Sequence, residues 1–330
     1  MTFRRTPSTL IIAAALVTPL AACSSGTTSP SPTAEALTSI VVSFSENIAD
    51  EVPLWIADEA GYFREEGLQV ELRSLASDQG FPALVAGQVQ LASMGGTQIV
   101  AGAAGGVDVK MLAALTPVSP FQLYANVATL DELRGKKLGY TSKSGSVYIA
   151  TLAALKQANI DPSEVNLVPL GSTANVNSAL LAGSIDAAVT HPPASLKFDD
   201  AGLHMLIDLA AQRIPTVSVG ISSTTAYINE HPDVIDKFMR ALKKGFDREV
   251  SDQAYATQVM GAHLEITDQR ALDQTYTFYS QEVLPKIPEV TVAALESSRQ
   301  ALIGSVDGVE NLDLAKLIDN SFVDRAFKGA

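Results

Sequence analysis

Polar side chains and glycines recur in four loops, each of which follows a predicted strand. These loops contain Ser45, Glu46 and Asn47; Gly95, Gly96 and Thr97; Ser144, Gly145 and Ser146; and His191. Hydroxyl, carboxylate and imidazole groups exchange hydrogen bonds with ligands, and glycine lets backbone N–H groups come close. In open α/β sheets, ligands bind beyond the carboxyl ends of the strands. Each residue taken singly has helix capping as its alternative role, but together the ten predict one small-molecule site.

The sequence offers little for catalysis or metal binding. The histidines, His191, His204, His231 and His263, are scattered and form no H-E-x-x-H pair. The only cysteine is Cys23, and no G-x-S-x-G elbow is present. We therefore expect no catalytic residue, no metal ligand and no cofactor.

Apolar strands alternate with amphipathic helices along the chain. Strands are predicted at residues 40–44, 69–72, 89–93, 107–115, 165–169 and 216–222, and helices at 53–60, 78–86, 98–104, 147–158 and 176–182. Further helices are predicted near 232–246, 252–262, 269–279 and 312–327. This alternation predicts an α/β fold with open, mostly parallel sheets and helices on both faces. The unbroken apolar run Ile40–Phe44 is typical of a strand that is covered on both faces.

The N-terminal segment points to export and anchoring. Arg4 and Arg5 precede an apolar stretch at residues 10–17 that is too short to span a bilayer. Leu20-Ala21-Ala22-Cys23 then resembles a bacterial lipobox, in which the peptide is cut before the cysteine and the thiol receives a diacylglycerol. We predict a signal peptide at residues 1–22, lipidation of Cys23 and a flexible Ser/Thr/Pro-rich tether at residues 23–39.

Composition narrows the class of partner. The chain has 330 residues, of which 47% are hydrophobic, and this length predicts about two domains with a substantial core. Its formal charge is −13, and no basic cluster stands out, which argues against nucleic acid as a partner.

One stretch is similar to a known family. Pro53, Ala57, Gly61-Tyr62-Phe63 and Gly67-Leu68-x-Val70 resemble the opening of extracytoplasmic solute-binding proteins of ABC importers, in the family of sulfonate, nitrate and pyrimidine-precursor binders. Gly183-x-Ile185-Asp186-Ala187 resembles a later step of the same family. The resemblance implies a periplasmic-binding-protein type II fold with two α/β lobes, a central cleft and two crossing strands. Lobe 1 would combine residues 40–123 and 220–330, and lobe 2 would be residues 124–219, although spacing alone also allows two consecutive domains.

The resemblance also implies a function. The chain would be a lipid-anchored, monomeric, extracytoplasmic protein that captures a sulfonate, nitrate, aromatic acid or pyrimidine/thiamine precursor by hinge closure. It would deliver this solute to the transmembrane subunits of an ABC permease and touch the membrane only through its anchor. One alternative is a ligand-sensing surface lipoprotein without a transporter. The other is an enzyme on the same fold, although this chain lacks the cysteine-rich motif of the related eukaryotic synthases.

The predicted anchor can be tested by labelling cells with a fatty acid. We expect the wild-type protein to become labelled and Cys23→Ser to remain unlabelled, because the thiol is the acceptor of the lipid. Equal labelling of both proteins would contradict the lipobox interpretation.

Overall fold

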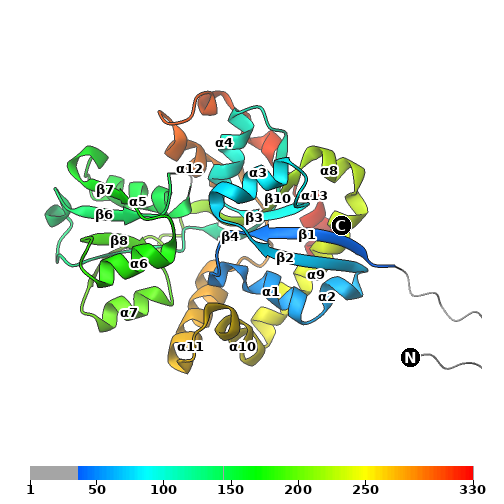
Figure 1. Ribbon diagram of the computed structural model, residues 1–330, viewed down its shortest axis with the longest axis horizontal. Coiled ribbons are helices and arrows are strands. Elements are labelled where there is room, and N and C mark those ends of the chain that lie inside the picture. The colour runs from blue at the N-terminus through cyan, green and yellow to red at the C-terminus, as the bar shows by residue number, and fades with distance from the viewer. Residues whose placement is uncertain (1–35, 144, 330) are drawn as a thin grey trace, which may run out of the picture. The chain divides into compact units, whose positions relative to one another are not determined.

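The computed structural model describes residues 36–143 and 145–329, which contain two five-stranded sheets (Figure 1). Contacts group the chain from Ala36 onward into one unit. Cys23, the predicted signal peptide, most of the predicted tether and Ser144 lie outside the described residues. Within the described part of the chain, no helix is both long enough and apolar enough to cross a membrane.

The first sheet has the strand order β2-β1-β3-β10-β4. Its strands are β1 (Thr38–Phe44), β2 (Leu68–Ser74), β3 (Leu91–Met94), β4 (Val109–Val118) and β10 (Pro215–Thr224). β1 is parallel to β2 and β3, whereas β10 is antiparallel to β3 and β4. β1 begins before the predicted start at Ile40, because Thr38 and Ser39 also pair with β2.

The second sheet repeats this arrangement in the order β7-β6-β8-β5-β9. Its strands are β5 (Gln122–Ala125), β6 (Lys137–Tyr140), β7 (Asn166–Pro169), β8 (Ala187–Thr190) and β9 (His204–Asp208). β6 is parallel to β7 and β8, and β5 is antiparallel to β8 and β9. Both sheets are therefore mixed, with one strand, β10 or β5, that runs antiparallel to the other four.

Two chain segments cross between the sheets and hydrogen-bond to each other. Residues 119–121 lead from β4 into β5, and residues 209–214 lead from β9 into β10. The Ser119 N–H donates to the Ile214 carbonyl (3.0 Å), and the Phe121 carbonyl accepts from the N–H groups of Leu209 (3.0 Å) and Ala210 (3.1 Å). Each segment supplies the antiparallel strand of the sheet that it enters. Paired backbone thus joins the two sheets.

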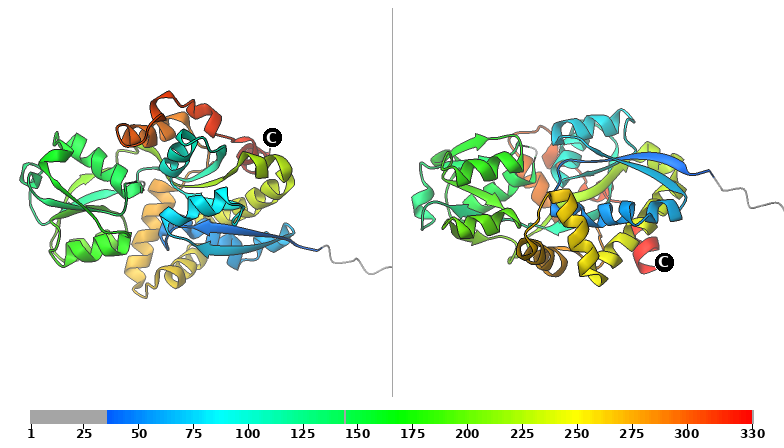
Figure 2. Two further views of the ribbon diagram at one scale, coloured as in Figure 1. Left: turned by 45° about the horizontal axis from the view of Figure 1, so that its top comes forward. Right: turned by 60° about the horizontal axis from the view of Figure 1, so that its bottom comes forward.

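Helices cover both faces of each sheet (Figure 2). The α-helices of the described residues are α1 (Val52–Glu59), α2 (Tyr62–Glu65), α3 (Ser77–Val85), α4 (Gly96–Ala104), α5 (Ser146–Gln157), α6 (Thr173–Leu181), α7 (Ala194–Asp200), α8 (Thr225–Glu230), α9 (Pro232–Ser251), α10 (Gln253–Leu264), α11 (Gln269–Phe278), α12 (Val292–Leu302) and α13 (Ser321–Val323). Ile40 and Val42 of β1 belong to the core cluster that contains α9, while Val41 packs on the cluster that contains α4 and α12. The expectation that this strand is covered on both faces is confirmed.

The C-terminal region departs from the sequence prediction. Here α12 is a helix that the sequence does not predict, and the helix expected at residues 312–327 is replaced by a 3-10 helix at Leu314–Leu317 and a π-helix at Asp324–Lys328 that flank α13. Earlier in the chain, α7 and β9 are also absent from the prediction. The physical reason lies at the edge of the first sheet. Ile318 forms a bridge with Met111 of β4, and the Asp319 N–H donates to the Met111 carbonyl (3.0 Å). This pairing with an edge strand interrupts the helix.

Gly245 of α9 provides a test of the packing between α9 and α1. A Cβ atom at this position would lie 2.1 Å from the Pro53 carbonyl oxygen, which is backbone and cannot swing away. We expect Gly245→Ala to lower the free energy of unfolding by about 1–3 kcal/mol through overpacking. Gly80→Ala in α3 is the matched control, because its new Cβ would come no closer than 3.9 Å to a neighbouring atom. This substitution should be neutral or slightly stabilising. Urea denaturation followed by circular dichroism measures both, and a fully stable Gly245→Ala protein would contradict this packing.

Candidate ligand-binding site

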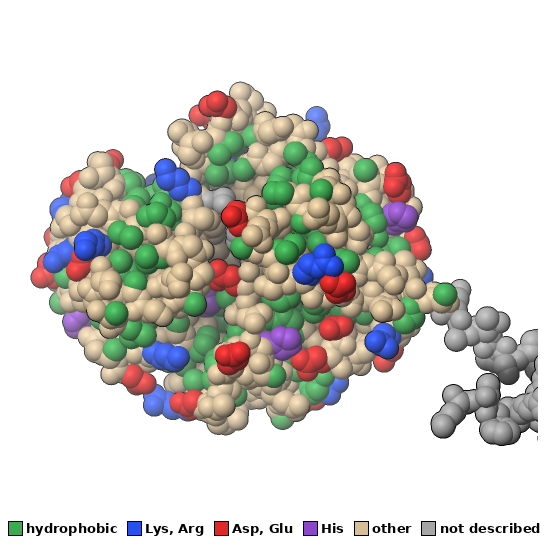
Figure 3. All heavy atoms as spheres, in the orientation of Figure 1, with side chains coloured by type: hydrophobic (Ala, Val, Ile, Leu, Met, Phe, Trp, Pro, Cys, Tyr) green, Lys and Arg blue, Asp and Glu red, His purple; other side chains and the backbone are tan. Residues whose placement is uncertain are grey.

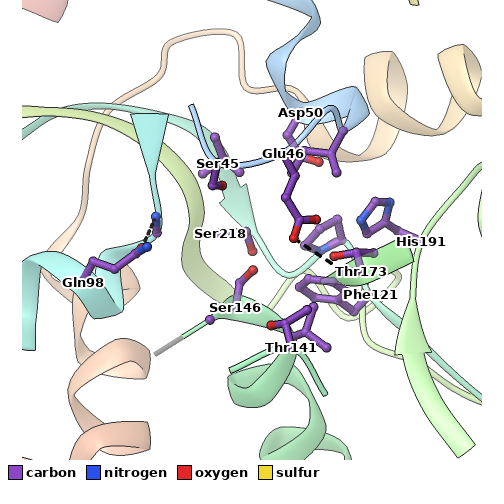
Figure 4. Close-up of a pocket in the computed structure, with 16 residues that line it drawn as sticks. Ser45, Glu46, Asp50, Gln98, Phe121, Thr141, Ser146, Thr173, His191 and Ser218 are labelled. Carbon is purple, nitrogen blue, oxygen red and sulfur yellow. Dashed lines mark hydrogen bonds between the residues drawn. The ribbon is translucent and has the colours of Figure 1, made fainter. Parts of the chain in front are cut away.

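A pocket lies between the two sheets, where the parallel strands β1, β3, β6 and β8 end (Figure 4). The residues that line it are Ser45, Glu46, Ile48, Asp50, Gly95, Gln98, Pro120, Phe121, Thr141, Gly145, Ser146, Val147, Thr173, His191, Ser218 and Val219. The space-filling view shows that the surface is hollowed between the part that carries the first sheet and the part that carries the second (Figure 3). The pocket is therefore placed as the topology of open α/β sheets requires.

Most of the predicted site residues meet in this pocket. Ser45, Glu46, Gly95, Gly145, Ser146 and His191 line it. Asn47 is exposed and Thr97 is buried, and neither belongs to the lining. Gly96 also lies outside the lining. The side of its Cα that would carry a Cβ is packed against α12, where that Cβ would stand 2.6 Å from the Ser298 Oγ. Ser144 lies outside the described residues.

Sequence reasoning missed several lining residues. They are Ile48, Asp50, Gln98, Pro120, Phe121, Thr141, Val147, Thr173, Ser218 and Val219. The sequence could have predicted Thr173 as a site residue, because the Ser172–Asn175 run opens a helix in the same way as the predicted loops do. No sequence pattern predicts Ser218 as a site residue, since it lies within β10 and only the crossing topology brings that strand to the cleft.

Two hydrogen bonds join the walls of the cleft directly. The Thr173 N–H at the start of α6 donates to the Glu46 Oε1 (3.4 Å), which places a carboxylate at a helix N-terminus. The hydroxyl of Tyr279, which follows α11, lies 3.0 Å from the Nδ1 of His191, which follows β8. In both pairs one residue belongs to the first sheet and its helices, and the other belongs to the second. The conformation described is thus one in which the two sides touch across the pocket.

Asp50, which lines the pocket, is the centre of a buried network of hydrogen bonds. Its carboxylate accepts from the Thr116 hydroxyl (2.5 Å) and from the Tyr279 hydroxyl (2.9 Å). Burial raises the pKa of Tyr279 well above its usual value, and Asp50 adds to the shift, so the hydroxyl keeps its proton and donates it. The Pro192 carbonyl, which can only accept, lies 2.9 Å from the His191 Nδ1. This contact assigns a proton to Nδ1, and Tyr279 then accepts from His191.

Two further acids, Glu51 and Glu249, are fully buried near Asp50. Burial raises the pKa of both carboxyl groups to about 8. For Glu51, the Ser93 hydroxyl opposes this shift by donating to the carboxyl oxygens (2.7 and 2.9 Å). Neither carboxyl oxygen of Glu249 has a hydrogen-bond partner among the described residues. Both groups are therefore protonated and uncharged below about pH 8.

The lining favours binding by hydrogen bonds. It offers hydroxyls, the carboxylates of Glu46 and Asp50, one imidazole and the N-terminus of α5, while no lysine or arginine of the described chain belongs to it. The described residues contain no group of three or more His, Cys, Asp or Glu side chains arranged to hold a metal ion. Such a lining suits a polar ligand that carries hydrogen-bond donors.

Comparisons with known proteins agree with this architecture. A family model described as "NMT1/THI5 like" matches residues 49–256. The riboflavin-binding protein RibY of Chloroflexus aurantiacus is 26% identical over 72% of this chain and 70% of its own. A 4-amino-5-hydroxymethyl-2-methylpyrimidine phosphate synthase of Aspergillus parasiticus is 23% identical over 70% and 73%. The alkanesulfonate-binding protein SsuA of Xanthomonas axonopodis superimposes with a TM-score of 0.71 at 15% identity, covering 86% of this chain and 99% of that protein. The predicted periplasmic-binding-protein fold is confirmed.

The buried acids predict how stability depends on pH. The pKa of Glu249 is about 8 in the folded protein and about 4.5 when the group is exposed, so the unfolded chain releases this proton first. Stability should therefore fall as pH rises from about 4.5 to about 8, by up to about 1.4 kcal/mol per pH unit for this group.

Glu249→Gln preserves the shape of the side chain and removes the titrating proton. We expect its free energy of unfolding to fall less steeply than that of the wild type over this range, and to exceed the wild-type value near pH 8. Urea denaturation at several pH values measures the slopes. Glu310→Gln is the control, because Glu310 is exposed and the slope should not change. A Glu249→Gln slope equal to that of the wild type would contradict the assignment.

Proposed function

The chain belongs to the NMT1/THI5-like family, and we propose that it is the solute-binding component of an ABC importer. The observation that carries this proposal is a polar pocket whose lining comes from both sheets, between which the described chain crosses in two segments that pair with each other. A ligand in such a pocket contacts both sides at once, so binding favours the closed arrangement of two lobes. The closed form is then what the transmembrane subunits of the permease recognise.

We further propose that the solute is a neutral or donor-bearing heterocycle. Glu46 and Asp50 present carboxylates to the pocket, and these would repel a nitrate or sulfonate ion and accept N–H or O–H bonds. The N–H groups at the start of α5 and the Ser146 hydroxyl complement an acceptor on the same ligand. The name of RibY, a riboflavin-binding relative, supports this class. The similarity to the alkanesulfonate-binding protein concerns the fold alone.

Closure would use the two bonds that already cross the cleft. The contact between Glu46 and the Thr173 N–H and the contact between Tyr279 and His191 both hold the sides together. Each is a modest interaction, of about 1 kcal/mol, so together they bias the hinge and do not lock it. Contacts with the ligand would supply the rest of the free energy that favours the closed form.

The proposed setting is extracytoplasmic, with a monomeric protein tethered to the membrane through lipidated Cys23. The lipobox-like sequence supports this part of the proposal. The synthase among the relatives raises an enzymatic alternative. Two features weigh against it: Cys23 is the only cysteine, and the pocket presents no nucleophile paired with a base in the described residues.

A thermal-shift panel tests the ligand class. We expect riboflavin or a pyrimidine to raise the melting temperature, and nitrate and an alkanesulfonate such as MOPS to raise it less, because a ligand stabilises only the form that binds it. Glu46→Gln removes one of the two carboxylates that line the pocket and should narrow this difference. Glu310→Gln, with its exposed carboxylate, should leave it unchanged. A larger shift with nitrate or MOPS than with every heterocycle would refute the assigned class.

A further inference from the structure

A second cavity adjoins the pocket and has a volume of about 350 Å³. Phe121, Ser146 and Ser218 line both spaces, so the two are neighbours in one cleft. Its walls are α5 from the second sheet and α12 from the first, and the crossing segments form its floor. We call this cavity the side compartment.

Apolar residues of α5 and α12 line part of the side compartment. Ile149, Ala150 and Ala153 have the spacing of one helical face on α5, and Ala301 faces them from α12. The carboxylate of Glu296 on α12 also borders the compartment, but it accepts from Gln300 (2.6 Å) and pairs with Arg299. Lys156 of α5 also lines the compartment, together with the hydroxyl-bearing residues Ser119, Thr216 and Ser297. The compartment therefore combines apolar walls with polar groups, and its carboxylate is already engaged.

Ser218 marks the junction of the two spaces. Its side chain is 5% exposed, and its Oγ has no hydrogen-bond partner among the described residues. Figure 4 shows this hydroxyl pointing into the pocket. A buried hydroxyl without a partner is costly, so this group is positioned to bind a polar atom of a ligand at the junction.

The pocket and the side compartment differ in volume, and this difference indicates which part of a ligand each can hold. The pocket with the polar lining has a volume of about 50 Å³. A cavity of about 150 Å³ is what holds a single benzene ring in a protein core. The polar pocket thus accommodates a small polar group and no ring, whereas the side compartment has room for more than one ring.

We propose that the side compartment between α5 and α12 receives the planar, fused-ring body of the ligand, while its donor-bearing polar group enters the pocket beside Glu46 and Asp50. This inference rests on the proposed function and narrows it to elongated, two-part ligands. Both walls of the compartment would close on the ring system, because they belong to opposite sides of the cleft.

Two probes that share a carboxamide test the proposal: benzamide with one ring and 2-naphthamide with two. We expect the wild type to bind 2-naphthamide at least tenfold more tightly in titrations followed by ligand-observed NMR. Ala153→Phe should abolish this gain and leave the affinity for benzamide unchanged, because Ala153 borders only the side compartment. Ala301→Phe fills the same space from α12 and serves as the second variant should the first not fold. Ala254→Phe, an exposed position on α10 away from both spaces, should retain the gain.

The proposal is overturned if the wild type shows no preference for 2-naphthamide, including the case in which neither probe binds. It is equally overturned if the gain persists in both filled variants. The solute-binding function is decided separately by the thermal-shift panel. A stabilising solute in the panel together with no two-ring gain would refute the side compartment alone.

Discussion

The pairing of the two crossing segments is the constraint on which the site depends. Residues 119–121 and 209–214 bond to each other through backbone groups and insert β5 and β10 as antiparallel strands. In each sheet the neighbouring parallel strands then end at the edge that faces the other sheet. Loops that are far apart in the chain, such as those after β1 and after β8, meet there. The position of the polar pocket therefore depends on this topology and not on any individual side chain.

Next to the pocket, burial determines how the acidic groups are hydrogen-bonded and which of them are charged. Asp50 holds hydrogen bonds from Thr116 of β4 and from Tyr279, and through Tyr279 it reaches His191 on the opposite side. Buried polar groups of this kind stabilise a fold only when their bonds are made, so the position of α11 is coupled to the geometry of the cleft. The neutral state of Glu51 and Glu249 limits the charge that accumulates around Asp50.

Local patterns predicted the elements well and the pairing of distant segments poorly. The capping and glycine signals around Gly61 and Gly67 correspond to positive φ angles of 78° and 80°, and the helix and strand that they bound are present. Six predicted binding residues reach the pocket because they follow parallel strands, a rule that sequence can express. Ser218 and α12 escaped prediction, since their roles arise from crossing strands and from packing across the cleft.

One residue belongs both to the paired crossing segments and to the lining of the pocket. The Phe121 carbonyl accepts the two bonds that pair the crossing segments, while the residue also lines both the pocket and the side compartment. If the protein closes as proposed, a ligand that contacts Phe121 would act directly on the crossing segments, without a relay of intermediate residues. We expect this to restrict how the protein diversifies, because a substitution at position 121 that alters solute preference also alters the mechanics of closure. New specificities would then arise more readily on α5 and α12, where the walls can be remodelled without disturbing the crossing segments.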